Sequence, residues 1–290
     1  MIEFHDATRE SAKARIALAG PSGSGKTYTA LALATALGRT AVVDTERGSA
    51  SKYVGINGWK FATFAPQTFA PLSLVEALSA ASGAAFEVVV VDSLSHYWMG
   101  VDGMLEQADR RSKGGNSFSG WKEARPDERR MLDALVSYPG HVIVTLRVKT
   151  EYVIEDNERG KKVPRKVGMR PEQREGIEYE FDVVGDMDLD NTLTVSKTRI
   201  PSLRRAVIPE PGAELAGTIA EWLAEGADAP GPLEYREKAL GLKTFEECKV
   251  LWDEVRARGL VNAPVVDEHG KGTVLGDLIV ALGHAKKAAS

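Results

Sequence analysis

The chain has 290 residues, which is enough for one sizeable domain and a smaller one. Its apolar fraction of 43% and its charged fraction of 27% are those of an ordinary soluble protein. The net charge of −4 excludes a uniformly basic surface, so any anion-binding face has to be local. The single cysteine, Cys248, excludes an internal disulfide and a metal cluster held by several cysteines. With no apolar leader after a basic start and no run of about 18 apolar residues, we expect a cytoplasmic protein.

Apolar runs alternate with helical patterns along the first half of the chain. Runs of the kind that form buried strands occupy residues 14–20, 40–46, 86–93 and 141–148. Patterns rich in helix formers or with an amphipathic period occupy residues 28–38, 71–83 and 124–140. Strands that alternate with helices predict an α/β fold with a mostly parallel, twisted sheet.

The pattern changes after these elements. Residues 179–200 contain two β-rich runs around Asp-Leu-Asp-Asn, which predicts a hairpin added to the edge of the sheet. A helix is predicted over 212–226, and the sequence Ala-Asp-Ala-Pro-Gly-Pro then predicts a linker. Three short helical patterns follow the linker. The chain therefore divides into a core over 1–226, a linker over 227–232 and a small helical domain over 233–290.

The stretch GPSGSGKT at residues 20–27 fits the pattern G-x-x-x-x-G-K-[ST] and lies after a predicted strand and before a predicted helix. Glycines let such a loop curl so that its N–H groups point at phosphates, and the helix adds its N-terminal dipole. Lys26 can reach the β- and γ-phosphates, and the hydroxyl of Thr27 can bind Mg²⁺. We expect nucleotide contacts from Gly20, Pro21, Ser22, Gly23, Ser24, Gly25, Lys26, Thr27 and Tyr28.

Acidic residues end two of the predicted strands, on the side where such sheets bind ligands. Asp92 ends VVVVD and fits the second contact to Mg²⁺; the other interpretation is a turn or cap. Glu46, in VVDTE, can orient or deprotonate the water that attacks the γ-phosphate. The alternative for Glu46 is a surface glutamate paired with Arg47. Asp44 is expected to cap or turn the chain.

These motifs, in this order, resemble a known family. GPSGSGKT, VVDTE, VVVVDS, VIVTLRVK and VSKTR resemble the RecA-like recombinase core, and more closely the compact RecA-like ATPases of bacteriophages that act as single-strand annealing proteins. The resemblance covers roughly residues 12–210. It implies a RecA-like P-loop NTPase core that uses ATP and Mg²⁺, and the cytoplasm of a host cell as the location.

The resemblance also implies roles for single residues. Glu46 matches the family's catalytic glutamate, which activates water. Thr145 falls where RecA has a glutamine that senses the γ-phosphate, and the shorter threonine is a departure from the pattern. Lys197 and Arg199 match a basic pair that reaches the neighbouring subunit's nucleotide, which would require an oligomer, either a ring or a filament. Without the resemblance, Lys197 and Arg199 can equally be two exposed strand residues.

Two basic stretches are candidates for DNA contact. Residues 158–174 carry a net charge of +5 and contain glycine and proline without a regular pattern, which predicts a loop. A second stretch, 110–122, is basic and glycine-rich and contains Trp121, which can stack on bases. The resemblance places both along the DNA path; the alternative is solvated loops of ordinary charge. The expected DNA contacts are Arg110, Arg111, Lys113, Trp121, Lys161, Lys162, Arg165, Lys166 and Arg170.

We therefore expect an ATP-dependent recombination protein that binds single-stranded DNA and promotes annealing or pairing. Its ATPase activity is expected to be stimulated by DNA and to occur between subunits of a homo-oligomer. A single-strand-binding protein is a further candidate partner, and no membrane partner is expected. Two alternatives stay open: a P-loop kinase of a small molecule, and a DNA-binding annealing module that uses ATP only as a structural ligand.

Overall fold

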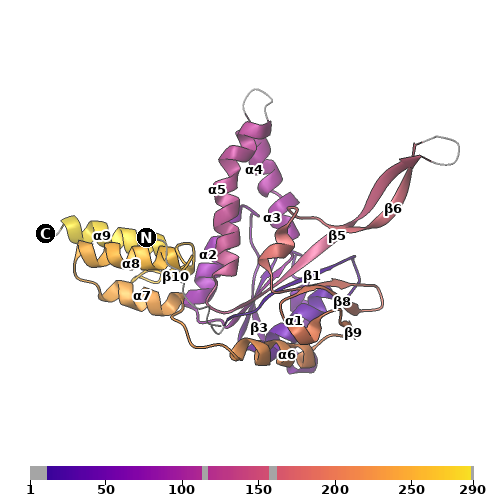
Figure 1. Cartoon of the computed structure of the whole chain (residues 1–290), viewed down its shortest axis with the longest axis horizontal. Coiled ribbons are helices and arrows are strands. Elements are labelled where there is room, and N and C mark those ends of the chain that lie inside the picture. Colours follow the sequence, from indigo (N-terminus) through magenta and orange to yellow (C-terminus); the bar gives the residue numbers. More distant parts are fainter. Residues whose placement is uncertain (1–11, 113–116, 157–161, 289–290) are drawn as a thin grey trace.

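The computed structural model describes residues 12–112, 117–156 and 162–288, with the backbone alone for residues 150–156 and 162–170 (Figure 1). A nine-stranded sheet has the order β3-β2-β4-β5-β1-β7-β8-β9, with β6 paired to β5 outside this path. Its strands are β1 (Arg15–Gly20), β2 (Thr40–Asp44), β3 (Phe61–Phe64), β4 (Val88–Asp92), β5 (His141–Asp156), β6 (Lys162–Pro171), β7 (Val183–Met187), β8 (Thr192–Thr198) and β9 (Val207–Pro209).

The strands from β3 to β7 in this order run parallel, as the continuous apolar runs predict. Both faces of this part are covered, because successive side chains of a strand point to opposite faces. In β1, for example, Ile16 packs in one core cluster and Ala17 in the other. The predicted hairpin is confirmed as β7 and β8: β7 pairs parallel with β1, and β8 returns antiparallel to β7.

Helices cover the two faces. On one face α1 and α6 pack together, and Leu31 and Ile219 join the same core cluster as Ile16. On the other face Leu74 of α2 and Leu135 of α5 join the cluster of Ala17. The helices of the core are α1 (Lys26–Leu37), α2 (Pro71–Gly83), α3 (Ser95–Met99), α4 (Met104–Arg111), α5 (Ser117–Val136) and α6 (Ala213–Ala224). The result is a sheet with helices on both faces, and the predicted α/β fold with a mostly parallel sheet is confirmed.

Two arms project from the core in different directions in Figure 1: α4 and α5 point upward, and β5 and β6 point to the upper right. In each arm the structure corrects a prediction made from the sequence. The segment 158–174, predicted as a loop, contains strand β6, which pairs antiparallel with β5 from Val148↔Pro171 to Asp156↔Lys162. β6 is an edge strand, where proline is tolerated, and its pairing with β5 outweighs its own irregular pattern. In the stretch 110–122, residues 110–111 end α4 and residues 117–122 begin α5.

The C-terminal residues form a small unit with its own core, which includes Tyr235, Leu251 and Leu278. Its three predicted helices are present as α7 (Pro232–Gly241), α8 (Phe245–Ala257) and α9 (Leu275–Ala288). A short hairpin of β10 (Pro264–Val266) and β11 (Gly272–Val274), which was not predicted, packs on α2. The hydroxyl of Ser79 in α2 donates to the carbonyl of Thr273 at 2.8 Å. That residues 1–226 and 233–290 are separate domains stays a prediction.

Within the described ranges, no helix combines the length and the apolar character that a bilayer crossing requires.

Candidate active site

The phosphate loop leaves β1 at Gly20 and enters α1 at Lys26. Gly23 and Gly25 have φ angles of 85° and 82°, in the left-handed region that favours glycine. A Cβ on Gly25 would lie 2.6 Å from the side-chain oxygen of Asn191, so glycine also allows a close approach. The loop opens onto a cavity of about 1210 Å³. Of the predicted loop residues, the cavity is lined by Gly20, Ser22, Gly23, Gly25, Lys26, Thr27 and Tyr28.

The Lys26 side chain, at the first turn of α1, is hydrogen-bonded across the phosphate loop. Its Nζ donates to the carbonyl oxygen of Pro21 at 2.8 Å, across the loop. Burial lowers the pKa of the Lys26 ammonium, and the nearby carboxylates Asp92 and Glu46 oppose this effect. A phosphate in the loop would offer this cation a stronger, charged acceptor than the Pro21 carbonyl.

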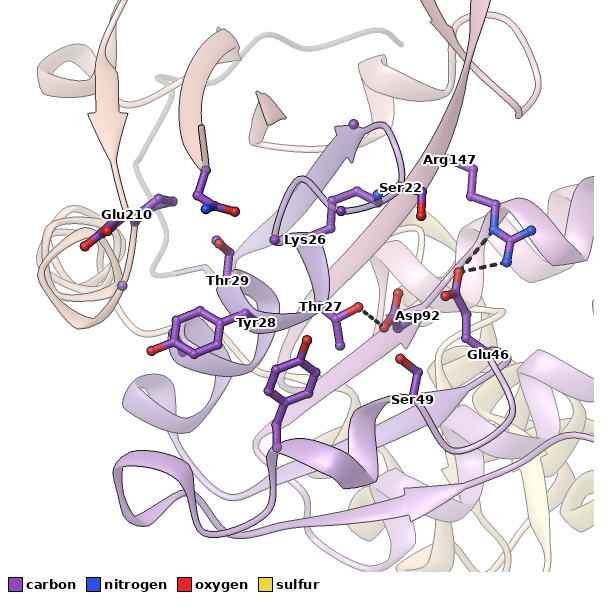
Figure 2. Close-up of a pocket in the computed structure, with 18 of the residues that line it drawn as sticks. Ser22, Lys26, Thr27, Tyr28, Thr29, Glu46, Ser49, Asp92, Arg147 and Glu210 are labelled. Carbon is purple, nitrogen blue, oxygen red and sulfur yellow. Dashed lines mark hydrogen bonds and ion pairs between the residues drawn. The ribbon is translucent and has the colours of Figure 1, made fainter. Parts of the chain in front are cut away.

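Thr27 and Asp92 meet where α1 faces the end of β4. Thr27 Oγ1 donates to Asp92 Oδ2 at 2.7 Å, and Asp92 is almost fully buried (Figure 2). Burial raises the pKa of the Asp92 carboxyl, and hydrogen bonds from Thr145 and Thr27 lower it. A hydroxyl and a carboxylate are the hard oxygen donors that Mg²⁺ prefers. In the described part of the chain, no group of three or more His, Cys, Asp or Glu could hold a metal. The Thr27 hydroxyl and the Asp92 carboxylate fit Mg²⁺ whose remaining ligands are phosphate and water oxygens.

Glu46 lies directly after β2, on the loop that leads into residues 50–53. Asp44 caps this loop: its Oδ1 accepts from the backbone N of Glu46 at 2.8 Å, and its Oδ2 from that of Ala50 at 3.0 Å. The Glu46 carboxylate lines the cavity, and its ion pair is with Arg147 rather than with its neighbour Arg47. Arg147 donates from Nε and Nη2 to Glu46 Oε1 at 3.1 and 3.0 Å (Figure 2).

Thr145, the predicted sensor, is fully buried, and its Oγ1 donates to Asp92 Oδ1. Arg147 lies two residues further along β5, on the same face of the strand, and lines the cavity. The sequence interpretation missed Arg147. The available signal was a cation near the carboxyl end of the predicted strand 141–148, at the edge where Asp92 and Glu46 also lie.

The far end of the cavity has an aromatic wall. The ring of Tyr28 lies 4.9 Å from that of Trp59 and 6.0 Å from that of Tyr53, measured between centroids. Asn57 Nδ2 donates to the Tyr28 hydroxyl at 3.1 Å. Because these rings line the same cavity as the phosphate loop, their apolar faces can receive a nucleobase. Of these residues, sequence reasoning had selected only Tyr28.

Lys197 and Arg199 are not among the residues that line this cavity. They lie at the end of β8 and just after it, where both contact their own chain. Lys197 Nζ donates to the carbonyl of Glu178 at 2.8 Å, and burial lowers the pKa of its ammonium. Arg199 pairs with Asp182 at 2.6 Å. Within one chain, the structure therefore does not bring this basic pair to the phosphate loop.

The predicted DNA contacts are spread over the two arms. On the helical arm Arg110 pairs with Asp102, Arg111 pairs with Asp127 at 2.6 Å, and the ring of Trp121 lies 5.5 Å from that of Trp98. These side chains are thus partly engaged within the chain. Lys113 and Lys161 lie outside the described residues. Lys162, Arg165, Lys166 and Arg170 belong to β6, where the backbone alone is described.

In this site a strand of a parallel sheet leads through a glycine-rich phosphate loop into a helix, and a threonine and an aspartate are placed for Mg²⁺. These features define the class of P-loop nucleoside triphosphatases. A family model described as an AAA domain matches residues 12–206, which is more than half of the chain. The chain belongs to this AAA domain family, and its core is a nucleotide-binding domain of the ATPase type. ATPases of this kind in general bind ATP with Mg²⁺. No curated protein matches the chain.

Proposed function

We propose that this protein is an ATP-dependent recombination protein of the phage RecA-like type, which binds single-stranded DNA and promotes annealing or pairing. The observation that carries the ATPase part is the convergence of Lys26, Thr27, Asp92 and Glu46 on one cavity. A phosphate loop with a carboxylate beyond the metal-binding pair is the arrangement expected for hydrolysis, because the carboxylate is available to a water molecule.

In the proposed reaction Lys26 binds the β- and γ-phosphates, and Thr27 and Asp92 would hold Mg²⁺. The bound Mg²⁺ would neutralise charge that develops on the phosphate oxygens. Glu46 accepts a proton from a water molecule as the water oxygen forms its bond to the γ-phosphorus. The bond from the γ-phosphorus to the bridging oxygen breaks, and ADP takes up the electron pair. The products are ADP and phosphate.

The two arms support the DNA-binding part of the proposal. Both belong to segments that follow strand ends near the nucleotide cavity: α4 and α5 follow β4, and the β5–β6 arm is a direct extension of β5 (Figure 1). β5 passes the cavity at Arg147 and continues as one strand to Asp156. A strand that touches both the nucleotide site and a DNA-binding arm can transmit a shift between them.

The basic pair Lys197 and Arg199 supports an oligomer. Both cations lie away from the cavity of their own chain, so a role in catalysis requires the nucleotide of a second copy. We propose that ATP is hydrolysed at such an interface, with charge from Lys197 and Arg199 stabilising the transition state. A single-strand-binding protein stays a candidate partner.

The test is steady-state ATP hydrolysis with and without single-stranded DNA at low salt, for the wild type and for Glu46→Gln. Glu76→Gln, on the exposed side of α2, is the matched control. We expect several-fold stimulation by DNA, lost in Glu46→Gln and kept in the control. ATP consumption that requires a small-molecule acceptor instead of DNA would replace the proposal with the kinase alternative. Unchanged DNA annealing by Glu46→Gln would identify ATP as a structural ligand only.

A further inference from the structure

The guanidinium of Arg147 is aimed into the nucleotide cavity by a firmly held backbone. The backbone N of Arg147 donates to Ser95 Oγ at 2.9 Å, and its carbonyl accepts from the backbone N of Glu172 at 2.7 Å. The preceding residues of β5, such as Val144 and Leu146, are buried in the core. The side chain of Arg147 therefore starts from a fixed point and extends into the cavity, where 43% of its surface is exposed.

The position of Arg147 within the cavity is informative. Figure 2 shows Tyr28 at one end, Lys26 and Thr27 in the middle, and Arg147 with Glu46 at the other end. A nucleotide whose base lies against Tyr28 and whose β-phosphate lies in the loop would direct its terminal phosphate toward Arg147 and Glu46. A diphosphate in the same pose lacks this terminal phosphate.

The ion pair with Glu46 is of a kind that a phosphate can displace. Both hydrogen bonds go to a single carboxylate oxygen, Oε1, and the side chains of Arg147 and Glu46 are 43% and 28% exposed. Ion pairs exposed to this extent are weak, because water screens the two charges. A phosphate offers more charge and several oxygens in a geometry that matches the guanidinium fork.

We propose that Arg147 is a ligand of the terminal phosphate of a bound nucleoside triphosphate and exchanges Glu46 for it on binding. The exchange frees Glu46 Oε1, so that both carboxylate oxygens can accept from the attacking water, and this last step rests on the proposed function. With a diphosphate bound, Arg147 keeps its ion pair with Glu46, and Oε1 stays occupied. The release of Glu46 from Arg147 thus depends on the third phosphate.

The test measures binding of a fluorescent, non-hydrolysable ATP analogue and of fluorescent ADP, each with Mg²⁺, to the full chain. We expect Arg147→Ala to weaken binding of the ATP analogue by about 10- to 100-fold and to change the affinity for ADP by less than about two-fold. Arg147→Lys is expected to recover part of the loss, since it restores charge without the guanidinium fork. Arg39→Ala, at an exposed arginine beside α2, is the control.

A second comparison separates a phosphate ligand from a residue that only positions Glu46. In a Glu46→Gln background the ion pair is already absent, so Arg147→Ala should still weaken the ATP analogue selectively if Arg147 contacts the phosphate. No further loss in that background, or equal losses for the ATP analogue and ADP, would overturn the assignment. These binding measurements use no DNA and need no hydrolysis. A failure of DNA-stimulated hydrolysis would therefore count against the proposed function without contradicting the assignment of Arg147 as a phosphate ligand.

Discussion

Thr145→Val tests whether Thr145 supports the metal site or senses the nucleotide. Thr145 is fully buried, and its hydroxyl donates to Asp92 Oδ1, while Thr27 donates to the other oxygen at 2.7 Å. Valine has nearly the same volume, so the substitution removes one hydrogen-bond donor from Asp92 without opening a large cavity. We therefore expect the change to act through the ionised Asp92 carboxylate.

The size of the effect follows from the charge on Asp92. A hydrogen bond to a charged group contributes about 1.5–3 kcal/mol, so the free energy of unfolding should fall by about this amount at pH 7. Burial already raises the pKa of Asp92 in the folded protein, and loss of the Thr145 bond raises it further. A carboxyl with a raised folded pKa loses stability as pH rises from its unfolded pKa through its folded pKa. The difference between variant and wild type should thus be larger at pH 7 than near pH 4.

The assay is urea unfolding at pH 7 and near pH 4, together with ATP hydrolysis as a function of Mg²⁺ concentration, with and without DNA. We expect a higher Mg²⁺ requirement for Thr145→Val and an unchanged ratio of DNA-stimulated to basal rate. Thr63→Val, at an exposed position in β3, makes the same substitution away from Asp92 and serves as the control. Loss of DNA stimulation with a normal Mg²⁺ response and normal stability would refute this reasoning and restore Thr145 as the sensor.

Three further expectations follow from the same structure. Arg15→Met should lower the free energy of unfolding, measured in urea, by about 3–5 kcal/mol. The reason is that the buried guanidinium donates to several backbone carbonyls near the end of α5, and a loss below about 1 kcal/mol would contradict this. Burial lowers the pKa of His141 to about 4, whereas in the unfolded chain its pKa is the ordinary 6.5. The free energy of unfolding should therefore fall by about 3 kcal/mol as the pH drops from 6.5 to 4. His141→Gln should flatten that profile in urea titrations, and an unchanged slope would exclude His141 as its source. Lys26→Ala should weaken ATP-analogue binding by about 10- to 100-fold while the urea midpoint stays unchanged, and equal affinity would place the phosphates elsewhere.

The core of the fold could be predicted because its signals are local. The valine run that ends in Asp92 is apolar on both faces, which only a covered parallel strand tolerates at this length. The helix over 71–83 is predicted with the bounds that the structure shows, because Pro71 marks its start and Gly83 its end. The phosphate loop is recognised in the same way, from its spacing and its two flanking elements.

The elements that sequence analysis missed depend on distant partners. β6 forms because β5 offers it a long antiparallel ladder, and neither its composition nor its prolines indicate this. Gly120 favoured a loop in the sequence, since glycine weakens helices. In the structure it lies inside α5, where a Cβ would come within 1.9 Å of the Ala108 carbonyl of α4. The glycine therefore allows the two helices of the arm to approach, which a single sequence does not reveal.

The contacts of Lys197, in β8, and Arg199, just after it, show what the proposed assembly would require. Lys197 donates to three carbonyls of the segment 178–181, and Arg199 is paired with Asp182, so neither cation is idle within its own chain. Reaching the nucleotide of another copy means giving up these contacts for a phosphate, which as a charged acceptor competes well with neutral carbonyls. Lys197 faces neutral acceptors, and Arg199 faces a carboxylate. Lys197 should therefore be the easier of the two to recruit, and Arg199 should move only when the partner's nucleotide supplies comparable negative charge.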